Sequence, residues 1–195
     1  MILWRMEQGF ASAILAVLLA LFIRAFLFEL ARVKGTSMKD TLENREVMLV
    51  SKIRYTTLWL RLPFQSRQKK EACPKWVLGG VPKRFDVVIC RYPHRGDTNF
   101  VKRVVGLPGE CVELREGVLY VDGERQEEPY VSAAYRGGFL SDFGPVTVPD
   151  DSFFVLGDHR NVSNDSRRVG AVRRAWITGK VLAVLFPFRL ARRIR

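Results

Sequence analysis

The chain has 195 residues, 48% of them hydrophobic and 27% charged, so it can bury a core and is neither disordered nor of low complexity. Its net charge of +12 indicates an anionic partner, either nucleic acid or an acidic membrane surface. Three cysteines without paired spacing and only two histidines exclude a disulfide framework, a zinc site and a multi-histidine metalloenzyme. We therefore expect neither a metal nor a cofactor.

An apolar run lies near the start of the chain. Residues 11–23 carry no charge, and the run from Phe10 to Phe28 approaches the about 20 residues that a bilayer requires, with Arg24 extending its guanidinium to the headgroups. A core helix and a cleaved signal peptide are the alternatives, but the run is apolar all round and no Ala-x-Ala-like site follows before Ser37. We predict a short segment at residues 1–9 and a retained transmembrane anchor at 10–28. The flanking charges do not fix its orientation.

Beyond this run the pattern is typical of β-strands. Short apolar or alternating runs predict strands at Glu46–Lys52, Asp86–Arg91, Val101–Val105, Cys111–Leu114, Val118–Val121, Ser152–Leu156 and Gly179–Phe186. Turn signals separate these runs, and Arg115-Glu116-Gly117 between two of them predicts a hairpin. Many short strands with close turns indicate a mainly β fold, an antiparallel sandwich or barrel-like domain over residues 29–188.

Two basic segments stand outside this strand pattern. Residues 58–84 interrupt the rhythm of strands and are rich in lysine and arginine, which predicts a long surface insertion. Residues 189–195 are too short and too charged to span a bilayer, so we interpret them as a solvated basic tail in peripheral contact with anionic membrane lipids.

Three segments carry candidate chemistry. Gly35-Thr36-Ser37-Met38 is an ordinary turn when taken alone, but its serine becomes a nucleophile if a base removes its proton. Lys102 interrupts a strand-like run: either it points to water, or burial lowers the pKa of its amine and makes it a general base. The segment from Gly157 to Arg167 gathers hydroxyls, carboxylates and guanidiniums, either as local ion pairs or as a network that orients a site.

Taken together, the order and spacing of these segments resemble the bacterial type I signal (leader) peptidases, membrane-anchored serine proteases with a Ser/Lys dyad. The resemblance covers nearly the whole chain except residues 58–84. It implies that Ser37 is the nucleophile and Lys102 the general base. It also implies supporting roles for the other motif residues, namely Gly35, Met38, Arg103, Asp158, Arg160, Ser163, Asp165 and Arg167. Of these, Ser163 would use its hydroxyl to place the lysine.

The chain departs from this family pattern at three positions. Asp40 stands where proline is usual, and Phe85 stands where glycine is usual. Gly35 occupies a position at which some members have a serine whose hydroxyl helps to bind the oxyanion. The oxyanion hole would therefore depend on backbone N–H groups, chiefly that of Ser37. None of these departures removes the dyad.

The resemblance also implies a function and a place in the cell. It implies a serine endopeptidase that removes N-terminal signal peptides from exported preproteins after small residues of the Ala-x-Ala type. The partners would be signal peptides emerging from the secretion machinery and anionic membrane lipids, and not nucleic acid. The place would be the cell (plasma or inner) membrane, with a single pass and the catalytic domain on the extracytoplasmic side. Ser37 follows the apolar run by nine residues, which reach at most about 30 Å, so its site must stay near the bilayer.

Other interpretations compete with this one. A nucleic-acid or lipid-binding module without catalysis would use the positive charge directly, and a Ser/Lys self-cleaving regulator would need a DNA-binding domain where the apolar run lies. A processing peptidase specialised for one conjugation or pilus substrate fits the same motifs. Within the enzyme class, the alternative chemistry is a Ser-His-Asp triad that combines Ser37 with His159 or His94 and with Asp158 or Asp165.

Overall fold

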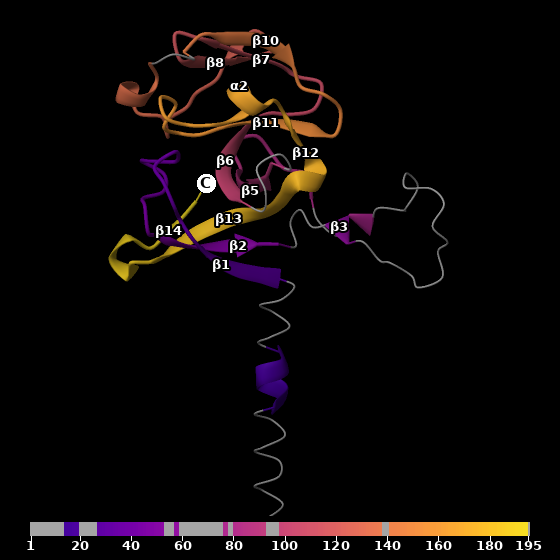
Figure 1. Cartoon of the computed structure of the whole chain (residues 1–195), viewed down its shortest axis with the longest axis vertical. Helices are drawn as coiled ribbons and strands as arrows, with labels where there is room; N and C mark the ends of the chain where they lie inside the picture. Colours follow the sequence, from indigo (N-terminus) through magenta and orange to yellow (C-terminus); the bar gives the residue numbers. More distant parts are fainter. Residues whose placement is uncertain are drawn as a thin grey trace, which may run out of the picture.

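The computed structural model describes residues 14–19, 27–52, 57–58, 76–77, 80–92, 98–137 and 141–194. Most of them form antiparallel sheets (Figure 1). The large sheet runs in the order β1 (Phe28–Arg32), β2 (Val47–Ser51), β13 (Ile177–Phe186), β5 (Val87–Arg91), β6 (Asn99–Gly106), β11 (Ser152–Leu156) and β12 (Val172–Arg173), with β14 (Arg192–Arg193) paired to β13. The small sheet runs in the order β10 (Phe143–Thr147), β7 (Cys111–Arg115), β8 (Val118–Val121) and β9 (Glu124–Arg125). The prediction of a mainly β, antiparallel fold is confirmed.

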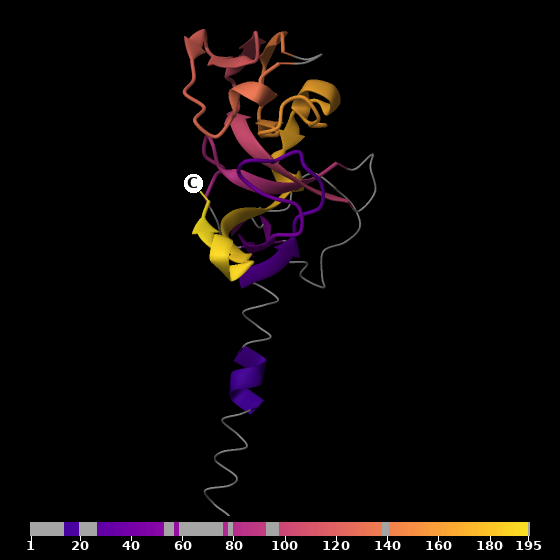
Figure 2. The same cartoon turned by 90° about the vertical axis from the view of Figure 1, so that its left-hand side faces the viewer.

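The two sheets lie one above the other along the long axis, with β6 and β11 between their outer strands (Figures 1 and 2). Helical structure is sparse in the described part of the β domain. It consists of the short helix α2 (Ser166–Val169) and the 3-10 turns η3 (Ala133–Tyr135), η4 (Arg174–Trp176) and η5 (Phe188–Leu190). The segments that carry the candidate chemistry therefore belong to strands and to the loops that join them.

Each predicted strand corresponds to an observed strand whose ends lie within two residues of the prediction. The predicted hairpin is also present, because β7 pairs with β8 and the turn places Glu116 at φ +51° and Gly117 at φ +74°. A glycine suits the second of these positions, since a Cβ atom there would collide with the backbone of Arg136. Seven described strands were not predicted from the sequence, and all of them are short or lie at a sheet edge: β1, β3 (Thr57–Leu58), β4 (Trp76–Val77), β9, β10, β12 and β14.

The C-terminal segment is not the solvated tail that the sequence analysis predicted. Residues of β14 pair with β13, and the backbone N–H of Ile194 donates to the carbonyl oxygen of Leu182. The Arg192 guanidinium donates to both carboxylate oxygens of Glu46, at 2.7 and 2.9 Å, and to the carbonyl oxygen of Thr41 at 2.6 Å. The Glu46 carboxylate is 2% exposed. A buried carboxylate needs such a partner, and this requirement fixes the segment against the fold.

Parts of two other predictions fall outside the described residues. Of the predicted anchor at 10–28, only 14–19 and 27–28 are described, and Phe28 already belongs to β1. Of the insertion at 58–84, the described ends form a two-stranded ladder between β3 (Thr57–Leu58) and β4 (Trp76–Val77). Among the helices of the described ranges, none combines the length and the apolar character needed to cross a bilayer.

The core of the β domain consists of three buried apolar clusters, and β6 contributes to two of them. Val104 packs with residues of β5 and β11, while Val105 packs with residues of the small sheet. A third cluster joins β2, β5 and β13 to the loop after β1. The part of β6 from Lys102 to Gly106 is therefore covered on both faces, and the polar side chains in this part are removed from water.

Candidate active site

Ser37 lies in the loop of residues 33–46 that joins β1 to β2, named here the serine loop. Its neighbours Met38 and Leu42 are buried in the apolar cluster of β2, β5 and β13. The backbone N–H groups of Thr41 and Leu42 both donate to the carbonyl oxygen of Met38, which winds this part of the loop into a tight turn. Burial of the two apolar side chains on either side of the turn fixes the backbone that carries Ser37.

Lys102 brings its amine to this serine from β6. Its Nζ lies 2.9 Å from Ser37 Oγ and donates to the carbonyl oxygen of Val101 at 3.0 Å. The register between β5 and β6 pairs Lys102 with Val88, and the lysine is only 2% exposed. The lysine therefore does not point to water, and its amine lies within hydrogen-bond distance of the Ser37 hydroxyl.

Burial lowers the pKa of the Lys102 amine, because desolvation disfavours the ammonium form. Cys90, Asp165 and Asp158 act in the opposite direction, but they contribute less than desolvation does. The Cys90 thiol is itself buried, which raises its pKa to about 11, so at neutral pH it carries no charge that would hold a proton on the lysine. The site therefore favours a neutral amine within hydrogen-bond distance of a hydroxyl, which is the arrangement that general-base catalysis requires.

The two carboxylates near the lysine are each occupied by an arginine. Arg103 donates from Nε and Nη2 to the two oxygens of Asp158, at 3.0 and 2.8 Å, and Thr41 Oγ1 donates to Asp158 at 2.5 Å. Arg167 donates in the same two-point manner to Asp165, at 2.9 Å from both nitrogens. Both arginine–aspartate pairs are almost fully buried. Because each negative charge is balanced at contact distance, neither aspartate is free to act as a counterion of Lys102.

Residues 157–167, named here the catalytic loop, are held by these pairs. Asp165 caps α2 by accepting from the backbone N–H of Arg167, and it also accepts from the backbone N–H of Gly157. The Arg167 guanidinium donates to the carbonyl oxygen of Arg160 at 2.7 Å. Asp165 pairs with Arg167 within the loop, whereas Asp158 pairs with Arg103 of β6 and Arg160 pairs with Glu128, which follows β9. These ion pairs tie the catalytic loop to its surroundings, as an orienting network does.

Gly157 allows the catalytic loop to approach the serine loop. A Cβ atom at this position would lie 2.5 Å from the carbonyl oxygen of Ser37 and closer still to Ser163 Oγ. The backbone N–H of His159 donates to the same carbonyl oxygen of Ser37 at 3.1 Å. The loop-to-loop contact therefore depends on a residue without a side chain.

The hydrogen bond between Ser163 and Lys102 that the resemblance implies is not formed. The Ser163 hydroxyl is buried and has no hydrogen-bond partner among the described residues, whereas the Lys102 amine contacts Ser37 and Val101. Burying a hydroxyl without a hydrogen-bond partner lowers the free energy of unfolding. Stability therefore does not explain why the Ser163 hydroxyl lies beside Gly157.

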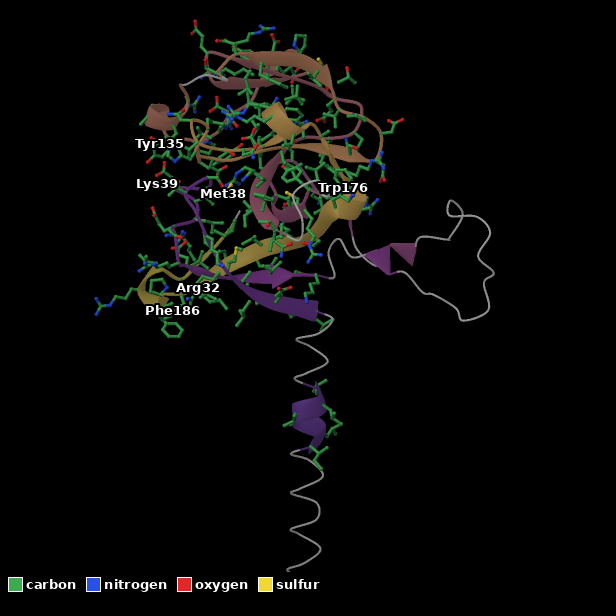
Figure 3. All side chains as sticks on the ribbon, in the orientation of Figure 1. Arg32, Met38, Lys39, Tyr135, Trp176 and Phe186 are labelled. Atoms are coloured by element: carbon green, nitrogen blue, oxygen red, sulfur yellow. The ribbon has the colours of Figure 1, made fainter. Side chains whose placement is uncertain are left out.

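The alternative Ser-His-Asp triad does not assemble with His159. The Nδ1 atom of His159 lies 3.2 Å from the carbonyl oxygen of Thr36, and its ring stacks on Tyr135 of η3 with 3.9 Å between centroids. The polar partner of Ser37 Oγ is Lys102. Lys39 lies 5.9 Å from the centre of the Tyr135 ring, and Figure 3 shows Met38, Lys39 and Tyr135 on the same side of the molecule. His94 lies outside the described residues.

The three departures from the family pattern have conformational correlates. Asp40 adopts φ +79°, which the fixed ring of proline does not permit, so the serine loop here takes a path that excludes proline at this position. Phe85 adopts φ +70°, a conformation that glycine reaches at no steric cost. Gly35 adopts φ +96°, and its N–H donates to the Asn44 side chain at 3.2 Å.

Two residues that touch this network were not anticipated from the sequence. Glu128 forms a buried ion pair with Arg160, and the ring of Tyr130 lies over the guanidinium of Arg103. The only sequence signal is a glutamate–proline–tyrosine step just after a predicted hairpin, which has no periodic or charge pattern of its own. Within the described ranges, no three His, Cys, Asp or Glu side chains are placed to hold a metal ion.

Comparison with known proteins yields relatives over nearly the whole chain. The family described as "Signal peptidase, peptidase S26" matches residues 6–186. The chain is 37% identical over 190 residues to a protein named signal peptidase I from Bacillus licheniformis, covering 93% of this chain and 89% of the relative. It is 36% identical over 190 residues to signal peptidase I S of Bacillus subtilis (strain 168), covering 93% and 90%. A solved signal peptidase I from Enterococcus faecalis V583 is 37% identical and superposes with a TM-score of 0.45, covering 51% of this chain and 96% of that chain.

The buried amine leads to a prediction about stability. Replacing Lys102 with methionine removes the cost of taking a lysine out of water and should raise the free energy of unfolding by roughly 1–3 kcal/mol at neutral pH. The native pKa lies below the ordinary value, so between the two values the unfolded chain holds a proton that the native chain lacks. The free energy of unfolding of the wild type should therefore rise with pH between these two pKa values. The difference in free energy of unfolding between Lys102→Met and the wild type should become smaller over the same range. Urea unfolding at several pH values measures this, and a less stable Lys102→Met would contradict it.

Proposed function

The chain belongs to the S26 signal peptidase family, whose members are serine endopeptidases, and from this premise we propose that it removes signal peptides by means of a Ser37–Lys102 dyad. The observation that carries the proposal is the 2.9 Å contact between Ser37 Oγ and a Lys102 amine that is almost fully buried. A lysine in water is protonated at neutral pH and cannot accept a proton, whereas a desolvated one can.

In the proposed acylation step, the neutral Lys102 amine accepts the Ser37 hydroxyl proton while Oγ attacks the scissile carbonyl carbon. Collapse of the tetrahedral intermediate breaks the C–N bond, and the Lys102 ammonium returns its proton to the leaving amine. The signal peptide then remains as an ester on Ser37. In deacylation the amine accepts a proton from the attacking water, and the proton returns to Ser37 Oγ as the ester breaks.

The remaining residues of the site have supporting roles in this proposal. Within the described residues, the backbone N–H of Ser37 has no acceptor, so it is available to the oxyanion. The open space around Gly35 leaves room for the substrate backbone beside it. Met38 anchors the serine loop in the core, and the arginine–aspartate pairs hold the catalytic loop against it. The preference for small residues before the cut is carried over from the family resemblance.

We also place the enzyme at the cell membrane, anchored by residues 10–28 with the β domain on the extracytoplasmic side. The described helical residues 14–19 lie apart from the sheets and expose apolar side chains (Figure 1). At the end of the β domain that includes β1 and η5, four further apolar side chains are exposed: Leu30, Phe186, Phe188 and Leu190. Phe188 is 81% exposed, an arrangement that favours a lipid surface over water. Figure 3 shows Phe186 near Arg32 at this end.

The dyad is tested with the full chain in detergent and a preprotein that has an Ala-x-Ala site. Ser37→Ala should abolish cleavage, and Lys102→Arg should be as inactive as Lys102→Ala, because a guanidinium does not deprotonate in a protein. The rate of the wild type should rise with pH along a limb well below the ordinary lysine value, since burial lowers the Lys102 pKa. Leucine in place of alanine before the scissile bond should reduce kcat/KM at least about 10-fold. Near-wild-type turnover of Lys102→Arg would refute this mechanism.

The membrane placement is tested by proteolysis of intact spheroplasts that express the full chain. External protease should digest the β domain if it lies outside the cytoplasm, while a cytoplasmic reporter protein stays intact. Replacing Phe186 and Phe188 with serine should leave cleavage of a soluble peptide unchanged but weaken the response of the rate to added anionic lipid. A β domain that is fully protected until the cells are lysed would overturn the placement.

Ser163→Ala separates a catalytic role of the unpaired hydroxyl from a structural one. Removing a buried hydroxyl without a partner should leave the free energy of unfolding unchanged or raise it by up to about 1–3 kcal/mol. If the hydroxyl engages Lys102 once substrate is bound, kcat should fall roughly 10–100-fold with little change in KM. Equal kcat for Ser163→Ala and wild type would show that the hydroxyl does not position the amine.

A further inference from the structure

We propose that Glu128 and Tyr130 are positioning residues of the enzyme, which act on the dyad through Arg160 and Arg103. The inference rests on the proposed function, because it concerns the same site. Both residues belong to the segment that leaves β9 of the small sheet, outside the serine loop, the strand β6 and the catalytic loop. No motif that we recognised in the sequence includes them.

Glu128 is buried and meets the catalytic loop through its carboxylate. Its Oε1 atom forms an ion pair with Arg160 Nη2, and the two side chains are 0% and 1% exposed. Tyr130 OH donates to the same Oε1 atom at 3.0 Å, and Arg136 donates to the backbone carbonyl of Glu128 at 3.3 Å. Tyr130 and Arg136, which lie close to Glu128 in the sequence, therefore fix its position independently of the catalytic loop.

The contact continues from Arg160 toward the nucleophile. Arg160 Nε donates to the carbonyl oxygen of Gly157 at 3.1 Å, so the guanidinium spans from Glu128 to the residue at which the two loops touch. Gly157 is the position where even a Cβ atom would reach the Ser37 carbonyl oxygen. A displacement of Arg160 would thus move the backbone that packs directly against Ser37.

Tyr130 makes a second, separate contact with the site. The centre of its ring lies 3.8 Å from the Arg103 guanidinium carbon, so the ring covers one face of the guanidinium. The edge of the same guanidinium donates to Asp158. Arg103 follows Lys102 in β6, and its other nitrogen donates to the carbonyl oxygen of Phe85 at 2.9 Å. Aromatic stacking on a guanidinium leaves its in-plane donors free for the carboxylate, so the ring fixes the plane in which Arg103 holds Asp158.

Stability alone is a poor explanation for this arrangement. Among the described residues, Glu128 Oε2 and Arg160 Nη1 are buried without hydrogen-bond partners, so the pair leaves one polar atom unsatisfied on each side. A buried ion pair that is incompletely satisfied contributes less to stability than apolar side chains of the same size would. The burial also raises the pKa of Tyr130, which keeps its phenol neutral as a hydrogen-bond donor to Glu128. The arrangement instead fixes the orientation of the Arg160 guanidinium, which contacts Glu128 on one side and the carbonyl oxygen of Gly157 on the other.

The test compares substitutions of Glu128 with two matched controls in the full chain. Glu128→Ala should lower kcat about 10–100-fold with KM changed less than about threefold, because the dyad is misplaced while the substrate cleft remains. Glu128→Gln keeps an acceptor for Arg160 and should recover at least half of that loss on a logarithmic scale. Glu127→Ala, at the exposed neighbouring position, should behave as wild type. Val172→Ala removes a fully buried side chain of β12 in the large sheet, and at a temperature where it is folded its kcat should match wild type.

The readouts separate the possible outcomes. Activities are normalised to the folded fraction from circular dichroism, and Tyr130→Leu or Glu128→Gln carries the test if Glu128→Ala does not fold. Tyr130→Phe keeps the ring and should lose less than Tyr130→Leu. If Ser37→Ala is inactive but Glu128→Ala, Glu128→Gln and Tyr130→Leu turn over like Val172→Ala, the positioning role is wrong and the dyad stands. If Ser37→Ala remains active, the proposed function itself fails.

Discussion

The desolvation of one amine is the constraint on which the rest of the site depends. In the proposed mechanism Lys102 acts as a base only while it is uncharged, and the uncharged form is favoured by keeping water and unbalanced carboxylates away. Placing it in the part of β6 that is covered on both faces provides the first condition. The second is provided by Arg103 and Arg167, each of which occupies a neighbouring aspartate at two points. The ion pairs of the site are therefore best understood as protection of a neutral group.

The sequence was sufficient for the regular part of this arrangement. Alternating or apolar runs predicted β2, β5, β6 and β11 within two residues, because burial on a pleated strand imposes a pattern that side chains reveal. The pairing of Ser37 with Lys102 could be predicted only through the family resemblance, since nothing local relates residues so far apart. Strands β1 and β14 were missed because they are short, charged and at an edge. The C-terminal segment was misread because its charge suggested solvent, although Arg192 has a buried partner in Glu46.

The unusual residues of this chain become intelligible only with their backbone angles. A phenylalanine at φ +70° is strained, and Phe85 is compensated by its ring contact with Tyr130 at 5.6 Å and by its carbonyl, which accepts from Arg103. Asp40 at φ +79° excludes the proline that the family resemblance led us to expect. No single-residue propensity identifies such positions in advance, because the requirement comes from the path of the serine loop.

The segment after β9 is consequently part of the proposed active site, although it contributes no member of the proposed dyad. The large sheet supplies Lys102 and the loop that carries Ser37, but the side chains that brace Arg160 and Arg103 come from the segment after β9. Arg103 lies in β6 and Arg160 in the catalytic loop, yet both are contacted by neighbouring residues, Tyr130 and Glu128 respectively. A single segment can hold both guanidiniums only if its own position is fixed, and Arg136 contributes to this by donating to the backbone carbonyl of Glu128. In the proposed mechanism, the segment after β9 thus takes part in setting the geometry of the dyad, although it lies outside the serine loop, β6 and the catalytic loop.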